Sequence, residues 1–268
     1  MLACCVSSAT VHRYVDAQAA SIDGAWVLTD NAISYNPVLK GDPDDVWISP
    51  SQSYNSTGNS IGIRFYPTDG SAGSTDKLTY PLVIGNASFA PPTNGTVGYY
   101  NGFAVKFLSA TDFQTPAGKV LCFQWWQGSP YGPPLRMAIT GTSGSNVIYR
   151  FLVLNNDTLG NPSAVPLDIG GGTVPYGAWG AFVVYTKFNY AGGGVVTVWQ
   201  NGTQVFTWTG KLGYDPSTKP YANATSATPY PNQKIQIEFG LYREAQMKKH
   251  MIFLDEIRHA DTYAEALP

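Results

Sequence analysis

The fold of this chain is constrained above all by a series of short, apolar, strand-like segments with turn-forming residues between them. The segments are rich in β-branched and aromatic residues, and Pro, Gly, Asn and Ser gather in the connections. No stretch has the periodicity of a long amphipathic helix, so no crossover helix is available to join parallel strands. We therefore predict an all-β fold of antiparallel sheets, either a sandwich or a jelly roll, in which the concave face of a curved sheet can form a binding cleft. The predicted strands are 60–67, 99–108, 119–127, 135–140, 146–154, 181–188, 195–200, 203–210, 234–243 and 250–258.

The domain organisation follows from the continuity of this pattern. No linker, internal repeat or block of like charge divides the 268 residues, so we expect a single domain over residues 1–268. Residues 1–20 are the one stretch with helical character, and we expect them to be a loosely attached N-terminal segment. A chain of this length can bury a sizeable core.

Charge and composition exclude some classes of partner. The net charge is −2 and charged residues make up 13% of the chain, so no broad positive field exists for a nucleic acid. No apolar run reaches the length of a membrane-spanning helix, and we expect a monomer with no membrane partner. In contrast, 17 Tyr and 7 Trp supply flat apolar rings with polar edges, which suit stacking on sugars. The composition therefore favours a polysaccharide partner, and an acidic one would need a local cluster of Lys and Arg.

Cysteines and glycosylation signals bear on the location of the protein. Cys4, Cys5 and Cys122 lack metal-type spacing, and Cys122 is expected to be a buried free thiol within a strand. Six Asn-X-Ser/Thr sequons occur, although Asn-Gly-Thr is also an ordinary hairpin turn. Together these features favour a secreted, extracellular protein. The sequons begin at Asn55, Asn86, Asn94, Asn156, Asn201 and Asn223.

Side chains alternate between the two faces of a strand, and this rule separates core residues from cleft residues. In segment 234–243, one face is apolar and the other carries Glu238, Gly240 and Tyr242. Gly240 has no side chain, so a ligand could approach the backbone beside Tyr242. A solvent-exposed face without function would show the same alternation. The apolar face consists of Ile235, Ile237, Phe239 and Leu241.

The same rule, applied to the other strands, predicts one concave surface of polar and aromatic residues. In segment 119–127, alternation assigns Leu121 and Phe123 to the core and Cys122 to the opposite face. Each basic residue taken alone is also explained as a solvated surface charge. The predicted surface consists of Arg64, Gln124, Trp126, Arg136, Tyr185, Lys187 and Tyr242.

Residue types that are missing or misplaced exclude several reactions. The Glu residues all lie in the final stretch of the chain, and the Glu-X-Asp-X-X-Glu strand of laminarinase-like hydrolases is missing. Glycosidases need two placed carboxylates, so a hydrolase is disfavoured. His12, His250 and His259 lie outside the candidate cleft strands, which argues against a Ser-His-Asp triad or a His-rich metal centre. The sequence has no phosphate loop and no organic cofactor is expected, so Tyr, Arg, Lys and Gln remain for the chemistry.

Five motifs, in a fixed order along the chain, carry a resemblance to a known family. They are QWWQGSPYGPPL (124–135), WGAFVVYTKF (179–188), VWQNGTQV (198–205), FGLYR (239–243) and FLDEIRHADTY (253–263). This set resembles the jelly-roll polysaccharide lyases, above all glucuronan lyase (polysaccharide lyase family 20), and more distantly heparin lyase I and the jelly-roll alginate lyases. The resemblance covers roughly residues 60–265. It implies an all-β fold, a concanavalin-like β-jelly-roll sandwich of two antiparallel sheets with a concave cleft. It also implies cleavage of a polyuronate, with β-1,4-glucuronan as the best candidate, by β-elimination.

The resemblance also implies roles for individual residues. Gln124 matches the Gln of the family's Gln-X-His strand, and Tyr242 matches the Tyr of its Lys-X-Gly-X-Tyr strand. A Tyr would act as base and then as acid, with Tyr242 as first choice and Tyr185 as second. The C6 carboxylate would be neutralised by Gln124 and Arg64, with Lys187 and Arg243 behind them. Residues expected to contact the substrate are Tyr66, Trp126, Gln127, Arg136, Glu238 and Arg243.

Two departures from the family pattern leave alternatives open. Trp126 stands where the family has His, and Glu238 stands where it has Lys. A mechanism that needs that His cannot be transferred, and the departures favour the glucuronan-lyase branch. They also fit a non-catalytic carbohydrate-binding domain, and a glycoside hydrolase is the third candidate.

The resemblance implies a structural calcium ion as well. Asp255 is the best-placed ligand, because hard carboxylate oxygens suit calcium. The alternative is an ordinary surface Asp beside Arg258.

Overall fold

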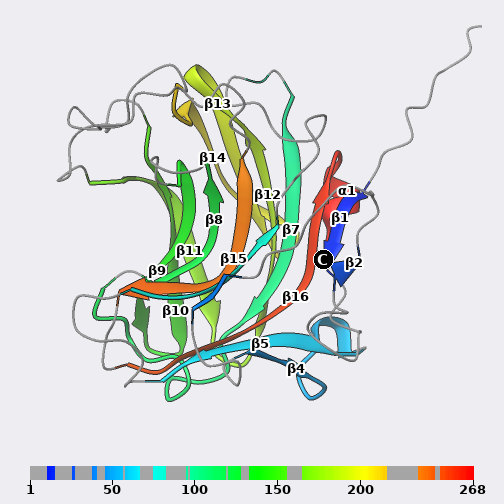
Figure 1. Ribbon diagram of the computed structural model, residues 1–268, viewed down its shortest axis with the longest axis vertical. Helices are drawn as coiled ribbons and strands as arrows, with labels where there is room; N and C mark the ends of the chain where they lie inside the picture. Colours follow the sequence, from blue (N-terminus) through cyan, green and yellow to red (C-terminus); the bar gives the residue numbers. More distant parts are fainter. Residues whose placement is uncertain are drawn as a thin grey trace, which may run out of the picture.

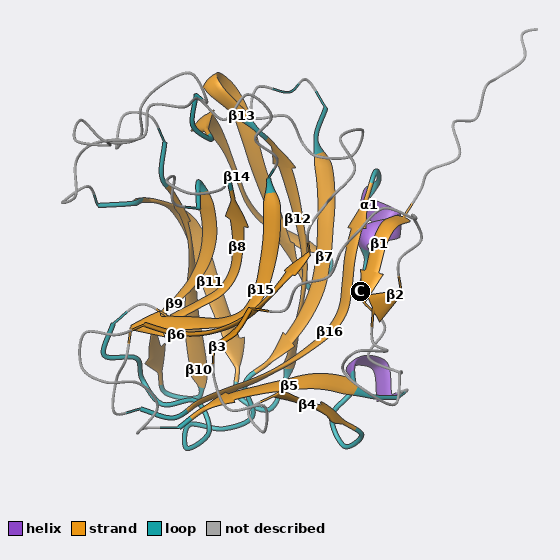
Figure 2. Cartoon of the chain, viewed as in Figure 1, coloured by secondary structure: helices purple, strands orange, loops and turns teal. Residues whose placement is uncertain are grey.

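The computed structural model describes residues 11–15, 26–27, 38–40, 46–56, 58–66, 75–82, 95, 97–118, 120–127, 133–155, 165–215, 235–244 and 248–268. These residues form two antiparallel sheets that lie face to face, with one short α-helix near the C-terminus (Figures 1 and 2). The predicted all-β sandwich is confirmed. Among the residues so described, no helix has the length and apolar character needed to cross a membrane.

The larger sheet has nine strands. Seven follow the order β14-β13-β12-β7-β16-β1-β2, while β5 pairs with β16 and β4 pairs with β5. Helix α1 (Tyr263–Ala266) packs on the outer face of this sheet through Ala266. The strands are β1 (Val11–Val15), β2 (Trp26–Val27), β4 (Val46–Ser49), β5 (Ser60–Phe65), β7 (Tyr99–Lys106), β12 (Trp179–Lys187), β13 (Asn189–Gln200), β14 (Thr203–Leu212) and β16 (His250–Ala260).

The smaller sheet has seven strands in the order β11-β10-β9-β8-β15-β6-β3. Figure 1 shows β8, β9 and β15 curving along the left of the molecule, so the outer face of this sheet is concave. The strands are β3 (Val38–Lys40), β6 (Thr75–Leu82), β8 (Val120–Trp126), β9 (Leu135–Ser143), β10 (Asn146–Val153), β11 (Leu167–Pro175) and β15 (Gln236–Glu244).

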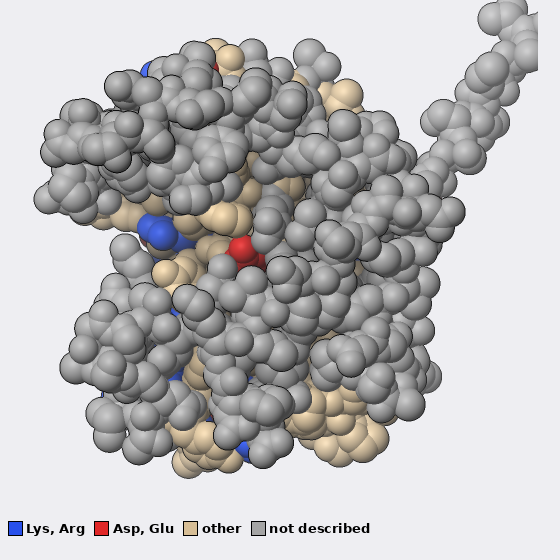
Figure 3. Space-filling model, viewed as in Figure 1, with Lys and Arg blue, Asp and Glu red and all other residues tan. Residues whose placement is uncertain are grey.

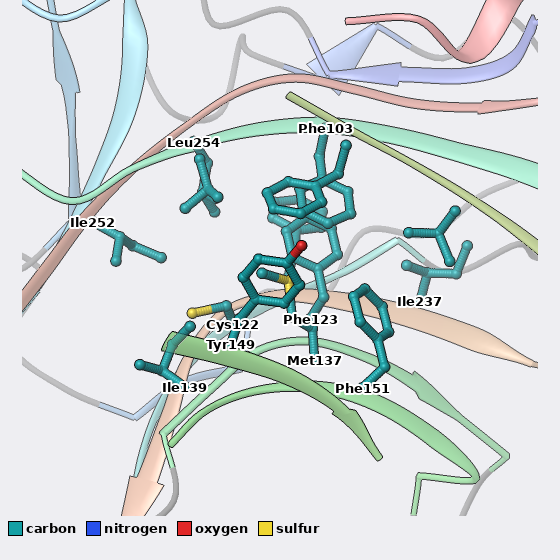
Figure 4. Packing of buried hydrophobic residues seen from close by; sticks show 14 of the residues in the cluster. Phe103, Cys122, Phe123, Met137, Ile139, Tyr149, Phe151, Ile237, Ile252 and Leu254 are labelled. Carbon is teal, nitrogen blue, oxygen red and sulfur yellow. The ribbon is translucent and has the colours of Figure 1, made fainter. Parts of the chain in front are cut away.

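The hydrophobic core lies between the inner faces of the two sheets (Figure 4). Phe103 of β7 stacks on Phe123 of β8 with ring centroids 3.6 Å apart, which joins the two layers. The apolar face predicted for segment 234–243 is confirmed, because all four of its residues are buried in this core. Burial of apolar area contributes roughly 25 cal/mol per Å² and is the main force that holds the two sheets together.

All the predicted strand segments are strands in the structure, with ends that differ by a few residues. Strand β11 escaped prediction because its sequence, LDIGGGTVP, has glycines where alternation would show. Strand β6 was not predicted either. The helical character expected for residues 1–20 is wrong for Val11–Val15, which pairs with β16, and the rest of that segment lies outside the described residues.

The hairpin between β13 and β14 turns at Asn201 and Gly202. Their φ angles are 50° and 77°. Two successive positive φ angles are typical of a type I′ turn, for which Asn-Gly is strongly preferred. The Asn-Gly-Thr sequence at Asn201 therefore forms a hairpin turn, which was the alternative to its interpretation as a glycosylation signal.

A β-bulge in β8 reverses the predicted positions of two residues. Cys122 packs in the core, whereas Leu121 lies on the concave face with Ala138 and Leu152. The register between β8 and β9 shifts between Leu121 and Phe123, so β8 has one extra residue there. This insertion moves the alternation by one position. Cys122 is nevertheless the buried free thiol that was predicted, and burial raises its pKa.

Candidate active site on the concave face

Two rows of side chains cross the concave face, because residues directly opposite each other in antiparallel strands point to the same side. We name them the Glu238 row and the Tyr242 row. Neighbouring members of a row are about 5 Å apart, the spacing of adjacent strands. The Glu238 row runs Glu238 (β15), Gln124 (β8), Arg136 (β9), Leu152 (β10) and Asp168 (β11). The Tyr242 row runs Tyr242, Leu121, Ala138, Arg150 and Gly171 over the same strands.

Gln124 and Glu238 form a buried polar pair at one end of the Glu238 row. The two residues are 4% and 3% exposed, and Gln124 Nε2 donates a hydrogen bond to Glu238 Oε2. The other amide atom, Gln124 Oε1, is buried and has no hydrogen-bond partner within the described residues. The pair therefore places a carboxylate and an unsatisfied carbonyl oxygen beneath the surface of the concave face.

Arg136 is the cation of the Glu238 row, opposite Gln124. Burial lowers the pKa of its guanidinium, and the nearby phenols of Tyr214 and Tyr242 act in the opposite direction. An arginine side chain remains protonated in proteins, so the site keeps this positive charge. Arg136 Nε is buried without a partner among the residues described. Arg136 thus combines a fixed charge with unused hydrogen-bonding capacity, which suits an anionic ligand.

Tyr242 is partly exposed and packs against the apolar members of the concave face. Two residues before it, Gly240 has a φ of 130°, and the register of β15 against β8 shifts between Phe239 and Tyr242. A residue with a Cβ rarely adopts this φ, so glycine permits the bulge. Beyond the bulge, Tyr242 points to the same side as Glu238, as alternation predicted.

Tyr214 belongs to the site but was not found by sequence analysis. It follows the end of β14, which belongs to the other sheet, and it is 3% exposed. Its backbone N donates to Gln127 Oε1 at 2.7 Å, and Gln127 Nε2 donates to its backbone O at 2.6 Å. The prediction that Gln127 contacts substrate is therefore wrong, because its amide holds this segment in place. The alternation of side chains along a strand gives no prediction for Tyr214, because this residue lies past the end of β14.

Figure 3 shows that the molecule is hollowed on its left side, at the level of β8, β9 and β15. Lys or Arg atoms and Asp or Glu atoms are both visible inside the hollow. Both signs of charge agree with the Glu238 row, which has a carboxylate at each end and a guanidinium between them. The predicted concave cleft is present.

Comparison with known proteins decides the family. The sequence profile of the family described as "Polysaccharide lyase" matches residues 57–258, which is more than half of the chain. This chain belongs to the polysaccharide lyase family. No curated protein matched the sequence of this lyase.

Solved structures share the jelly-roll fold of this lyase. The endo-β-1,4-glucuronan lyase from the fungus Trichoderma reesei has a TM-score of 0.62 at 14% identity, over 97% of this chain and 99% of that chain. A mutant of alginate lyase Aly36B in complex with alginate trisaccharide has a TM-score of 0.52 at 14% identity, over 82% of this chain and 86% of that chain. At such identities the likeness concerns the fold. The resemblance to jelly-roll polysaccharide lyases is confirmed.

Four predicted site residues of the lyase lie on the outer face of the other sheet. Arg64 lies on β5, and its guanidinium stacks 4.4 Å from the ring centre of Tyr66, the residue directly after this strand. Tyr185 and Lys187 lie on β12, facing away from the core residue Val184. The prediction that all these residues share the surface of Tyr242 is wrong. Alternation finds the outer side of each strand but does not say which of the two outer faces of a sandwich it belongs to.

Tyr185 also has the wrong surroundings for a catalytic base. Its ring lies 4.9 Å from that of Tyr100, in an aromatic cluster against α1. Burial raises the pKa of Tyr185, and Tyr100 raises it further. A phenolate at this position is therefore disfavoured.

Arg243 is a structural residue of the lyase and does not reach the cleft. It is 1% exposed, and its Nη2 donates to the Tyr66 carbonyl at 2.8 Å while Nη1 lies 2.8 Å from His250 Nδ1. Its guanidinium also stacks on Phe65. The predicted substrate contact is wrong, since alternation from Tyr242 turns Arg243 inward, where it ties β15 to β5 and β16.

The Asp255 carboxylate binds backbone N–H groups of the lyase. It is buried, and its two carboxylate oxygens accept hydrogen bonds from the backbone N of Tyr54 and of Glu256, both at 2.9 Å. In the described part of the chain no three His, Cys, Asp or Glu residues are grouped to hold a metal ion. The described residues around Asp255 do not fit a calcium site, and calcium enters no step below.

The described histidines lie where the sequence placed them, away from the cleft. His250 and His259 are both buried in β16 of the nine-stranded sheet. His259 Nδ1 lies 2.8 Å from Asn101 Oδ1, and its ring stacks on Tyr99. Neither ring takes part in the concave face.

Proposed function

We propose that this lyase cleaves a polyuronate by β-elimination on its concave face, with β-1,4-glucuronan as the first candidate substrate. The observation that carries the proposal is that Tyr242 and the partly buried Arg136 lie on one concave face, where Tyr242 packs against the cluster that contains Leu152, the cross-strand neighbour of Arg136. β-Elimination from a uronate needs a proton-transferring group and a cation for the carboxylate, and these two residues supply them in one cleft.

The first task is to neutralise the C6 carboxylate, because an anion beside C5 resists loss of the C5 proton. Arg136 takes this role in place of Arg64. A guanidinium can hold both carboxylate oxygens in a bidentate arrangement. The second N–H of the Gln124 amide can add a hydrogen bond to the negative charge that develops.

The second task is the transfer of the proton, for which Tyr242 is the proposed residue. In a β-1,4-glucuronate unit, H5 and O4 lie on the same ring face. One phenolate oxygen can therefore remove H5 and, as phenol, protonate O4. The C5–H electron pair becomes the C4–C5 double bond, and the C4–O4 pair leaves with O4. The products are a 4,5-unsaturated uronate and a free hydroxyl end.

Trp126 is the proposed sugar platform. It is partly exposed at the end of β8, on the same side of the strand as Gln124. Stacking of a sugar on an aromatic face would contribute on the order of 1 kcal/mol. The indole would thus hold the chain beside the Glu238 row.

A hydrolytic mechanism is disfavoured by the spacing of the carboxylates. Within the two rows, the carboxylates are Glu238 and Asp168, which are four strand spacings apart, or about 19 Å along the sheet. Paired carboxylates of glycosidases are about 5 to 9.5 Å apart. The cleft therefore favours elimination over hydrolysis.

The choice of substrate is supported by the fold. The glucuronan lyase structure aligns with nearly the whole of this chain, and the alginate lyase structure holds an acidic oligosaccharide. An acidic polymer and an extracellular location are part of the proposal. The sequon at Asn55, which lies exposed in the structure, supports that location.

The test is the absorbance of the 4,5-unsaturated product with glucuronan, alginate, heparin and pectate. We expect Tyr242→Phe to lower turnover about a hundredfold to ten-thousandfold while polymer binding persists. Tyr185→Phe is the matched control, since it removes the same hydroxyl from the opposite face, and it should stay active. Absence of product with all four polymers, together with retention in polysaccharide gels, would instead identify a binding domain without catalysis.

A further inference from the structure

We propose that Glu238 orients the Gln124 amide, and that this orientation makes the cleft select uronate units whose ring hydroxyls are free. The inference rests on the proposed function, because it names the substrate class of the same cleft. Its starting point is the hydrogen bond between two almost fully buried polar side chains, Gln124 and Glu238.

The orientation of the amide follows from the chemistry of its partner. An ionised carboxylate only accepts hydrogen bonds, so Gln124 must turn its NH₂ group toward Glu238. A flipped amide would place two acceptors against each other in a buried position. Both residues are almost fully buried, and they face each other in the register of β8 and β15. The carboxylate therefore fixes which end of the amide remains for a ligand.

The end that remains is an acceptor without a donor. Gln124 Oε1 is buried and unpartnered within the described residues, and a buried carbonyl oxygen costs free energy until a donor reaches it. A uronate carboxylate cannot supply that donor, but a ring hydroxyl can. Gln124 is thus suited to a hydroxyl group.

Arg136 places a cation beside that acceptor. It is the direct cross-strand neighbour of Gln124, so the two side chains start about 5 Å apart. A single uronate ring has both complementary groups, a carboxylate for Arg136 and a hydroxyl for Gln124. An esterified hydroxyl has no proton to donate and adds bulk. Chains with free hydroxyls should therefore be cleaved in preference to acetylated chains.

The experiment compares kcat/KM on two preparations of one polyuronate, with its hydroxyls free and with its hydroxyls acetylated. We expect the wild-type lyase to prefer the free form about tenfold, the effect of one buried hydrogen bond. Glu238→Gln should lose most of this preference, because the new amide can donate to Gln124 Oε1 and satisfy it internally. Asp168→Asn is the matched control, since it removes the same charge from the far end of the row, and it should keep the preference.

A wild type that cleaves both preparations equally, or a Glu238→Gln variant that keeps the full preference, would overturn the inference. If Glu238→Gln does not fold, Gln124→Met removes the same acceptor and should lose the same preference. Calorimetric binding of uronate oligosaccharides, free and acetylated, to Tyr242→Phe tests the inference without turnover. A wild type that cleaves no polyuronate would refute the proposed function, while the binding preference would still decide the role of Glu238.

Discussion

Acid is expected to destabilise this lyase through His250. The residue is buried, with Nδ1 2.8 Å from Arg243 Nη1 and Nε2 3.1 Å from the Gln114 carbonyl oxygen. Because arginine only donates, Nδ1 must accept and Nε2–H must donate, so the ring is neutral. Burial, followed by the charge of Arg243, lowers the pKa of His250 to about 3, with Lys248 adding to the decrease and the Gln114 carbonyl opposing it.

The size of the effect follows from this pKa. In the unfolded chain a His has a pKa near 6.5, so below that pH the unfolded state binds a proton that the folded state does not. The stability of the folded state is complete above pH 6.5 and falls as the pH drops toward 3, by about 1.4 kcal/mol per pH unit. At pH 5 the loss from this one site is about 2 kcal/mol. A protonated His250 would be repelled by Arg243. Arg243 directly follows Tyr242 on β15, so this repulsion acts on the strand that carries the proposed base.

Urea unfolding, followed by tryptophan fluorescence at pH 8 and at pH 5, measures this loss. His250→Gln is the matched variant, because it cannot titrate. Other titrating groups contribute to both proteins, so the difference between their pH dependences isolates His250. We expect the wild type to lose about 2 kcal/mol more than the variant between the two pH values. Equal pH dependence of the two proteins would refute the reasoning.

Three further predictions concern stability and reactivity. Gly102→Ala should lower the melting temperature, because its Cβ would lie 1.6 Å from the Ala266 carbonyl oxygen and displace α1; an unchanged melting temperature would contradict this. Asp255→Ala should lower the free energy of unfolding by about 1–3 kcal/mol, measured by urea unfolding, because two part-buried backbone N–H groups lose their acceptor. Cys122 should react with a thiol reagent after unfolding and not before, because burial hides the thiol and raises its pKa; rapid labelling of the native lyase would speak against the core position.

The strand that carries most of the site was predictable from sequence, and the neighbouring strand was only partly so. In β15, alternation correctly placed Glu238 and Tyr242 on the side opposite the core. In β8, the same rule correctly turned Gln124 to that side, but it exchanged Leu121 and Cys122. A bulge inserts one residue against a partner strand, and nothing in the local pattern of β8 marks that partner.

The sequence by itself determined the identity of the strands and the side of each strand that meets the core, because a side-chain period of two is a local property of an extended backbone. Only the tertiary structure decided which outer sides belong together. Two sheets that share one core have two outer faces, and the order of strands placed Tyr242 and Arg136 on one and Tyr185 on the other. Hydrogen bonds between the side-chain amide of Gln127 and the backbone of Tyr214 hold Tyr214 at the site, past the end of a strand of the other sheet. Contacts of this kind depend on how the sheets pack, and no period along the chain encodes them.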